Sequence, residues 1–219
     1  MPDTGGISIM AYGLQIFRDD GSLWMSPDVT PINYIGNLRY GGAGALVTSV
    51  PSYKTLMVFI RNDAAAAGTR ITLNNSGATW VINIIQTESS GFMYLFSNMV
   101  TSTSGWGVAV CNAAGEMVWN TDMLPLQFFT VPNPYGIDQT GSFAIQTGVQ
   151  LAVAPGICST WLAPLDPGAG KYLWGEIHAG ANGSVIYGVR SNGIEVTGQS
   201  VPRWKYKESF LCIDITRYP

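Results

Sequence analysis

Short apolar runs separated by turn residues extend along most of the chain. Runs rich in Val, Ile, Thr, Tyr, Phe and Trp are interrupted by Gly, Asn, Asp or Pro at roughly 8- to 12-residue intervals, which is typical of a β-sandwich or barrel. The only helix-favouring run, residues 64–67, is followed at once by Gly68. Strands are therefore expected at residues 12–17, 55–61, 70–73, 79–86, 92–97, 107–111, 126–131, 142–146, 149–153, 172–178, 184–189 and 210–215. The pattern predicts an all-β fold, either an antiparallel β-sandwich or a barrel-like domain.

Several short loops between these runs end in glycine, a residue that adopts the left-handed conformation of hairpin loops without a steric penalty. Gly21, Gly115 and Gly193 are predicted to lie at hairpin tips, and Gly21 and Gly115 are expected to have positive φ. Two further loops end at Gly77 and Gly183. Five hairpins imply a largely antiparallel arrangement.

Two of these hairpins belong to an internal repeat in which residues 12–35 align with residues 106–129 without a gap, at an offset of 94. The loops ending at Gly21 and Gly115 fall in register, as do Pro31 and Pro125. A third, shorter copy is indicated after residue 187. Each copy reads as a hairpin followed by a proline-marked turn into another strand.

The repeat also suggests how the chain is divided. On one strand of the second copy Trp106, Val108 and Val110 share a face, as the matching residues of the first copy do, and both faces are expected to pack in the core. The prediction is an N-terminal arm at 1–10, a first β half at 11–104 and a second at 105–219. The alternative is one merged β domain in which both hairpins share a core.

The block at residues 11–24, Ala-Tyr-Gly-Leu-Gln-Ile-Phe-Arg-Asp-Asp-Gly-Ser-Leu-Trp, resembles the start of small tail proteins of tailed bacteriophages. Those proteins often begin with Met-x-Tyr-Gly-Leu/Phe-x-Val, followed by an Asn/Asp-rich loop ending in Gly, and a second Tyr-Gly-type hairpin is common further on. Here Trp106 replaces the usual second tyrosine. The resemblance implies a component of the virion tail, at the tip, baseplate or fibre, assembled in the host bacterial cytoplasm with other tail proteins. It implies no catalytic residues.

Charge is scarce: 11% of residues are charged and 47% are apolar, whereas ordinary domains carry roughly 25% charge. Such a surface favours assembly into a homo-oligomer, with a trimer preferred, although a polar uncharged surface on a monomer is the alternative. The net charge of −3 gives no reason to expect a nucleic-acid partner. No apolar run is long enough for a membrane helix, and the N-terminus lacks signal-peptide features, so a soluble, non-exported protein without membrane insertion is expected.

The residues that carry metal and acid–base chemistry are few. Cys111, Cys158 and Cys212 are widely spaced and have apolar or small neighbours, so they are expected to be buried free thiols in a reducing cytosol. With His178 as the only histidine, they cannot form a usual zinc site, and no cofactor is expected. Glu176 and His178 share a strand face, but no nucleophile nearby completes a catalytic constellation, so a structural role is preferred.

Two regions are candidates for contact with a receptor, a sugar or another subunit. Residues 71–170 contain no Lys or Arg but contain Trp80, Trp119 and Trp161, which suit sugar stacking or subunit contact if they are exposed and the core if they are not. Arg203, Lys205 and Lys207 alternate along a candidate strand. Their basic face would suit the phosphates of an envelope glycolipid or an acidic partner, and the alternative is a solvated edge strand.

Three functions follow from these observations. The first is a structural or host-contacting tail component, which is not an enzyme. The second is a lectin-like carbohydrate-binding module. The third, a polysaccharide-degrading enzyme, needs paired carboxylates, and the spacing of the acidic residues gives no pair. The Gly-rich segment 1–9 is expected to be held by another chain, as a strand added to the edge of a neighbouring sheet.

Overall fold

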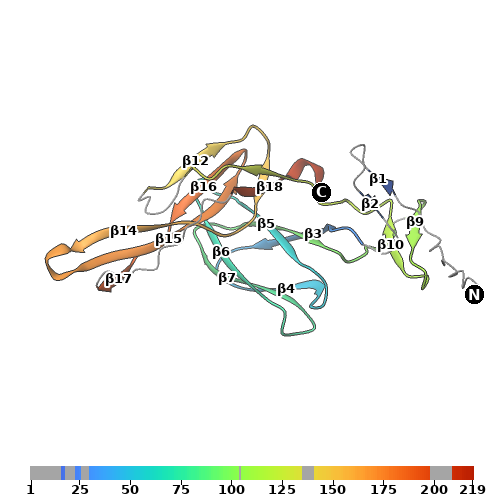
Figure 1. The fold of residues 1–219 in the computed structure, drawn as a ribbon, viewed down its shortest axis with the longest axis horizontal. Helices are drawn as coiled ribbons and strands as arrows, with labels where there is room; N and C mark the ends of the chain where they lie inside the picture. Colours follow the sequence, from blue (N-terminus) through green and yellow to red (C-terminus); the bar gives the residue numbers. More distant parts are fainter. Residues whose placement is uncertain (1–15, 18–22, 26–29, 104, 135–140, 198–208) are drawn as a thin grey trace, which may run out of the picture.

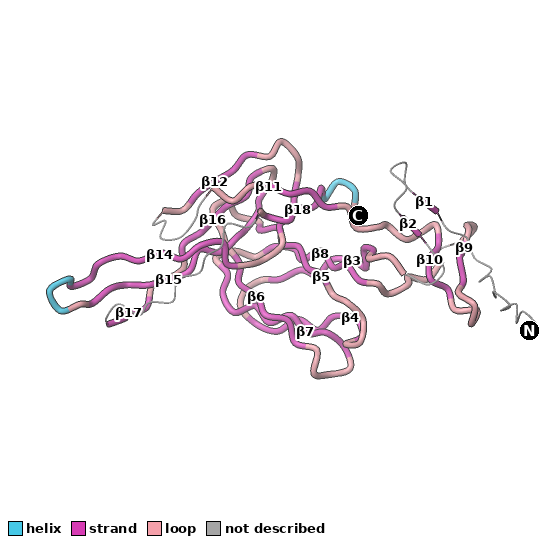
Figure 2. The backbone as a smooth tube through the Cα atoms, viewed as in Figure 1, coloured by secondary structure: helices cyan, strands magenta, loops and turns pink. Residues whose placement is uncertain are grey.

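The computed structural model describes residues 16–17, 23–25, 30–103, 105–134, 141–197 and 209–219, and these residues form an almost purely β protein (Figures 1 and 2). The strands are β1 Ile16–Phe17, β2 Leu23–Met25, β3 Asn33–Tyr40, β4 Gly44–Pro51, β5 Met57–Asn62, β6 Thr69–Asn74, β7 Thr79–Thr87, β8 Gly91–Ser97, β9 Ala109–Cys111, β10 Met117–Asn120, β11 Phe128–Val131, β12 Phe143–Gln146, β13 Leu151–Val153, β14 Ile157–Asp166, β15 Lys171–Asn182, β16 Val185–Arg190, β17 Ile194–Thr197 and β18 Phe210–Asp214. Two short 3₁₀ helices complete the set, η1 Pro167–Ala169 and η2 Ile215–Arg217. The all-β prediction is confirmed, and all strand pairings among these residues are antiparallel.

A six-stranded sheet in the order β11-β18-β13-β5-β8-β3 forms the centre of the molecule. Its strands come from both halves of the chain, since β3, β5 and β8 precede residue 104 and the other three follow it. The two halves therefore share a layer, which corresponds to the merged-domain alternative rather than to two independent units.

A second sheet has the order β12-β16-β15-β14, with β17 also paired to β15. Strand β15 is twelve residues long, and β16 and β17 lie one after the other along the same side of it. The outer part of the β14–β15 hairpin projects from the body at one end of the long axis (Figure 1). The third sheet, β4-β7-β6, forms a separate lobe below the centre in that view.

The period-two alternation of side chains gives the central sheet two apolar faces. On β8, Met93 and Leu95 point into the main core, which also contains Ile82 of the third sheet and Ile177 of the second. That core joins all three sheets. Phe92, Tyr94 and Phe96 of β8 point to the opposite face of the central sheet, where a second cluster forms around Phe59.

Residues after η2 cover this second cluster. The ring of Tyr218 meets Phe96 edge-on at 4.9 Å between centroids and lies 5.4 Å from the ring of Tyr34. The Tyr34 hydroxyl donates a hydrogen bond to the carbonyl oxygen of Pro219, and the Tyr218 hydroxyl donates to that of Pro125. The end of the chain is therefore part of the core packing.

The two repeated hairpins pair in the same register. In β1–β2, Ile16 is opposite Met25 and Phe17 is opposite Leu23. In β9–β10, Val110 is opposite Trp119 and Cys111 is opposite Met117, which are the same pairs displaced by 94 positions, with a bulge in each hairpin. The prediction of two related hairpins is confirmed, and both lie at the end of the long axis away from the β14–β15 hairpin (Figure 1).

The expected core packing of the second hairpin is wrong for two residues. Trp106 is fully exposed and Val108 is 60% exposed, whereas Val110 is buried in a small cluster with Val118 and Trp119. The hairpin stands away from the sandwich, and its own two strands can bury only one layer of side chains. An apolar surface is left open to solvent.

Candidate functional site

The structure separates the three candidate tryptophans. Trp161 is 3% exposed and belongs to the main core, so its proposed role as a contact residue is wrong. The guanidinium carbon of Arg190 lies 3.2 Å from the ring centroid and covers the indole. A charge stacked on an aromatic face closes the site that a sugar would need.

Trp80 and Trp119 are both half-buried and support neighbouring segments. The indole Nε1 of Trp80 donates a hydrogen bond of 2.7 Å to the carbonyl oxygen of Lys54, in the turn between β4 and β5. Trp119 packs against Val110 and Val118 in the second hairpin. Trp80 therefore supports the β4–β5 turn and Trp119 supports the β9–β10 hairpin. Neither indole ring is fully open to solvent.

The glycine predictions have mixed outcomes. Gly115 has φ +80° at the tip of the β9–β10 hairpin, as expected. Gly193 is wrong as a hairpin tip, because it lacks positive φ and β17 pairs with β15 instead of β16. A Cβ on Gly193 would lie 2.4 Å from the Trp161 ring, so this glycine is needed for close packing and not for a turn. Gly21 lies outside the described residues, as do Arg203, Lys205, Lys207 and the arm at 1–9.

An open groove lies between the β4–β5 turn and the β9–β10 hairpin and has a volume of about 540 Å³. Its lining residues are Thr30, Tyr53, Lys54, Val100, Asn112, Glu116, Met117 and Val118. Tyr53 is 82% exposed, an unusual environment for so large a ring. The groove combines an aromatic platform with an ammonium group, a carboxylate and an amide.

Local hydrogen bonds hold both walls of the groove. On one side, the Lys54 amide donates to the Pro51 carbonyl at 2.9 Å, which closes the turn that carries Tyr53. On the other side, the Asn112 side-chain oxygen accepts from the backbone amides of Ala114 and Glu116 at 3.0 and 2.9 Å. This Asx-type turn explains why asparagine begins the hairpin loop.

The Glu176–His178 pair exists but is buried. His178 Nε2 lies 3.0 Å from Glu176 Oε2, and Arg70 Nη1 lies 3.2 Å from the same oxygen. The Glu176 amide donates to Ser191 Oγ at 2.9 Å. His178 is only 1% exposed, and a Cβ on Gly68 would lie 3.1 Å from its Cβ, so no substrate reaches the imidazole in this conformation. The arrangement fits a structural ion pair better than acid–base catalysis.

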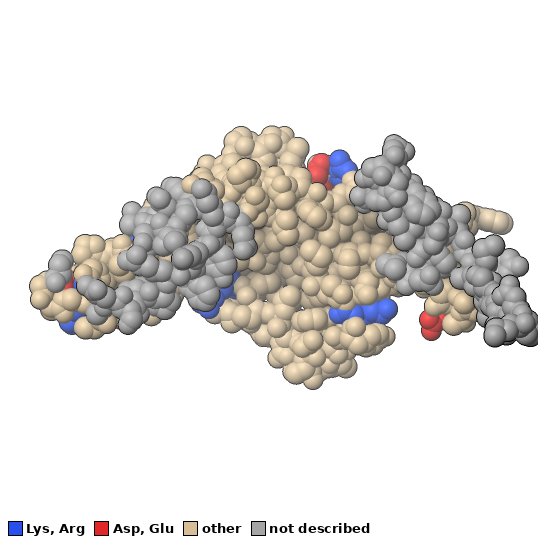
Figure 3. Space-filling view, in the orientation of Figure 1, with Lys and Arg blue, Asp and Glu red and all other residues tan. Residues whose placement is uncertain are grey.

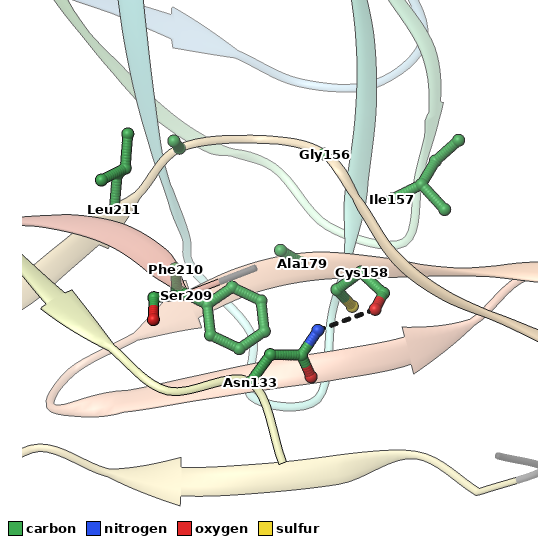
Figure 4. Close-up of a pocket in the computed structure, with 9 residues that line it drawn as sticks. Asn133, Gly156, Ile157, Cys158, Ala179, Ser209, Phe210 and Leu211 are labelled. Atoms are coloured by element: carbon green, nitrogen blue, oxygen red, sulfur yellow. Dashed lines mark hydrogen bonds between the residues drawn. The ribbon is translucent and has the colours of Figure 1, made fainter. Parts of the chain in front are cut away.

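A second cavity, of about 340 Å³, opens beside β14 (Figure 4). Asn133 lies at its side and donates a hydrogen bond of 2.8 Å to the carbonyl oxygen of Cys158. Burial raises the pKa of the Cys158 thiol to about 12, so this sulfur is not a nucleophile at neutral pH. The other lining residues are Ala154, Gly156, Ile157, Ala179, Ser209, Phe210 and Leu211, which supply mainly apolar and backbone surface.

The charged groups are dispersed over a largely uncharged surface (Figure 3). Within the described ranges, no three His, Cys, Asp or Glu side chains lie close enough together to hold a metal ion. In that same part of the chain, no helix has the length and hydrophobicity that a membrane crossing requires.

The chain matches no protein-family model, no curated protein and no solved structure. The fold defines the class as an antiparallel all-β protein.

Sequence reasoning missed the groove, although one signal for it exists. Tyr53 stands in a turn between Pro51 and Lys54, with no apolar alternation around it. A large aromatic residue in a turn has no sheet face to pack against and is a candidate for exposure. The contribution of Asn112 and Glu116 could not be foreseen, because it depends on how the second hairpin is placed against the sandwich.

Proposed function

We propose that this protein is a structural component of a bacteriophage tail, located at the tip, baseplate or fibre, where it also contacts the host surface. The observation that carries the proposal is the repeated hairpin. The motif at residues 11–24 resembles small tail proteins, and the two copies pair in identical register. A duplicated hairpin gives each chain two related surfaces for contact with neighbouring subunits. Two such surfaces suit a ring or trimer built from copies of one chain.

The exposed surface of the second hairpin supports a role in assembly. Trp106 is fully exposed, Val108 is 60% exposed and Met117 is 36% exposed, all on or next to one small hairpin. Clustered apolar side chains of this kind mark sites of protein contact. We propose that a second copy of the chain or another tail protein covers them.

No enzymatic activity is proposed. The histidine is buried and hydrogen-bonded to Glu176, and the two buried thiols have raised pKa values. The alternative of a lectin-like module is favoured by one feature, the polar groove with its exposed tyrosine. Both functions are compatible with a protein that binds a cell surface.

Solution mass tests the assembly part of the proposal. Light scattering coupled to size-exclusion chromatography is expected to give a trimer or larger ring for the full chain. The double substitution Trp106→Ser with Val108→Ser should shift the mass toward the monomer, because it removes the apolar contact. Val47→Ser is a matched control, since Val47 is 69% exposed on β4 in a different lobe. The proposal would be contradicted if the full chain were a monomer at every concentration. It would also be contradicted if Val47→Ser lowered the mass of the assembly as much as the double substitution does.

Two further experiments test the tail assignment itself. Peptides of this chain should be found by mass spectrometry in purified tailed particles from its source, and their absence would remove the assignment. Deletion of residues 1–9 should weaken assembly without lowering the melting temperature of the domain. A truncated chain that assembles like the full one would remove the proposed role of the arm.

A further inference from the structure

We propose that the groove between the β4–β5 turn and the β9–β10 hairpin binds an uncharged glycan, with Tyr53 as the stacking platform. The inference does not rest on the tail assignment, because glycan binding by the isolated chain can be measured whatever particle the chain belongs to.

Tyr53 presents its ring to solvent at the groove. The residue is 82% exposed. A ring held in water is costly unless something covers it part of the time, and the C–H face of a pyranose is a natural cover for an aromatic face. Tyrosine also loses little conformational entropy on binding, because it has only two side-chain torsions.

The turn that carries this ring is fixed from three directions. Trp80 Nε1 donates to the carbonyl of Lys54, the Ser52 amide donates to the carbonyl of Ala78 at 2.9 Å, and the Thr55 amide donates to the Asn98 side-chain oxygen at 2.9 Å. Such a turn needs little ordering when a ligand arrives. A pre-organised site binds more tightly than a mobile one with the same contacts.

The opposite wall supplies hydrogen-bonding groups in a fixed arrangement. Asn112 Nδ2 donates to Glu116 Oε2 at 2.8 Å, which orients the carboxylate. The other oxygen, Oε1, has no hydrogen-bond partner among the residues that the structure describes, so it is free to accept from a sugar hydroxyl. Lys54 provides ammonium donors on the facing wall, with its nitrogen 5.8 Å from the Tyr53 ring centroid. Hydroxyl groups both donate and accept, and this groove offers both functions.

The charge and polarity of the groove select the ligand class. Lys54 and Glu116 bring one positive and one negative group to opposite walls, so the site has no net charge to attract an acidic or a basic ligand. The apolar part of the lining, Val100, Met117 and Val118, is too small and too open for a lipid or a drug-like molecule. A pyranose ring has one apolar face and a rim of hydroxyl groups. It therefore matches both the aromatic platform and the polar walls of the groove.

Isothermal titration calorimetry of the full chain tests the proposal. The probes are neutral hexasaccharides of glucose, galactose, mannose, rhamnose and N-acetylglucosamine, together with hexasaccharides that carry carboxylate or phosphate groups. At least one neutral member should bind, and Tyr53→Ala should weaken it about tenfold, since the stacking contact is lost. Tyr53→Phe keeps the ring and should bind within about twofold of the original chain.

Two more variants locate the site. Glu116→Gln should weaken binding about threefold to tenfold, because a neutral amide is a poorer acceptor than a carboxylate. Phe128→Ala is the matched control, because Phe128 is an exposed aromatic residue on β11, outside the groove, and its loss should leave affinity unchanged. Circular dichroism and melting temperature establish that each variant is folded.

The proposal is overturned by any of three results. These are no binding of a neutral hexasaccharide at millimolar concentration, binding only of the charged members, or neutral binding that survives Tyr53→Ala or is weakened equally by Phe128→Ala. Binding of a neutral hexasaccharide would support the glycan site but would not test the tail assignment. That assignment is tested by mass spectrometry of purified tailed particles.

Discussion

Leu126 donates its backbone amide to the carbonyl oxygen of Ile32 at 2.8 Å, and these two residues occupy equivalent positions in the two repeats. The neighbouring Tyr34 amide donates to the carbonyl of Leu124 at 2.8 Å. The two segments run antiparallel, so a local two-fold relation links the strands that follow each hairpin. The repeats meet where their equivalent residues face each other, as the subunits of a symmetric dimer do.

Gly115→Ala should loosen the second hairpin. An alanine at φ +80° costs about 1 kcal/mol or more, because its Cβ approaches the following carbonyl. Hydrogen exchange should show faster exchange of the β9–β10 amides and unchanged protection in β5 and β8. Gly105→Ala is the control, since it has ordinary φ and nothing within 4 Å of an added Cβ. If the β9–β10 amides exchanged equally slowly in Gly115→Ala and Gly105→Ala, the expected strain at residue 115 would be contradicted.

Gly180→Ala should prevent stable folding. A Cβ at this position would lie 1.9 Å from the carbonyl oxygen of Ala67, and the backbone there cannot move without separating β15 from the loop before β6. We expect a loss on the order of 3 kcal/mol or more, visible in urea denaturation. Gly41→Ala adds the same methyl group in open space and should cost little. A Gly180→Ala midpoint close to that of the control would show that the two segments are not in tight contact.

His178→Ala should lower stability and leave assembly unchanged. The substitution opens a cavity and leaves Glu176 with Arg70 as its remaining charged neighbour, at a cost of about 2–4 kcal/mol. For a chain of this size the melting temperature should fall by roughly 5–15 °C. His178→Gln restores a donor toward Glu176 and should recover part of the loss. Assembly or glycan binding lost by a variant that remains folded would instead indicate a functional pair.

The cysteines should differ in reactivity. Burial raises the pKa values of Cys158 and Cys212 to about 12. The expected burial of Cys111 is wrong, because this residue is exposed on the small second hairpin. A thiol reagent at pH 8 should modify one cysteine in the folded chain and three after denaturation. Rapid modification of a second thiol without unfolding would contradict the burial of this pair.

The same two thiols should make stability depend on alkaline pH. Their pKa values are higher in the folded chain than the ordinary value of 9.0, so the unfolded chain loses these protons first. Their contribution is complete below pH 9 and is lost as pH rises from about 9 to about 12. Urea midpoints measured across that range should fall, and replacement of Cys158 and Cys212 by alanine should reduce the slope.

Alternation and turn chemistry predicted the strands whose signals are local. Strands such as β5, β7 and β8 are continuous apolar or β-branched runs, and they were expected within a few residues of their observed bounds. The repeat predicted that a strand follows Pro31, but the extent of β3 was missed because Gly36 and Asn37 interrupt its pattern. A bulge between Tyr34 and Gly36 accommodates that interruption, with Gly36 at φ +146°. Strand β14 was missed because Ser159, Thr160 and Pro164 resemble a loop.

The candidate site could not be predicted to the same extent, because it depends on tertiary placement. Trp80 and Trp161 have similar neighbourhoods in the sequence, yet one anchors a turn and the other is covered by Arg190. Nothing local in the sequence distinguishes the two tryptophans. The groove itself brings Tyr53 and Glu116 together from separate hairpins, whereas the sequence predicted that the second hairpin would pack in the core.

Strand β18 lies between β11 and β13 in the central sheet, although residues 210–214 are far from both of these strands along the chain. Until they arrive, β11 has no partner in that sheet and the aromatic face around Phe96 lacks Tyr218. Contacts between residues that are far apart in the sequence form slowly during folding. Before β18 joins the sheet, the folding chain therefore exposes an open strand edge and uncovered aromatic rings, the features that make folding intermediates prone to aggregation.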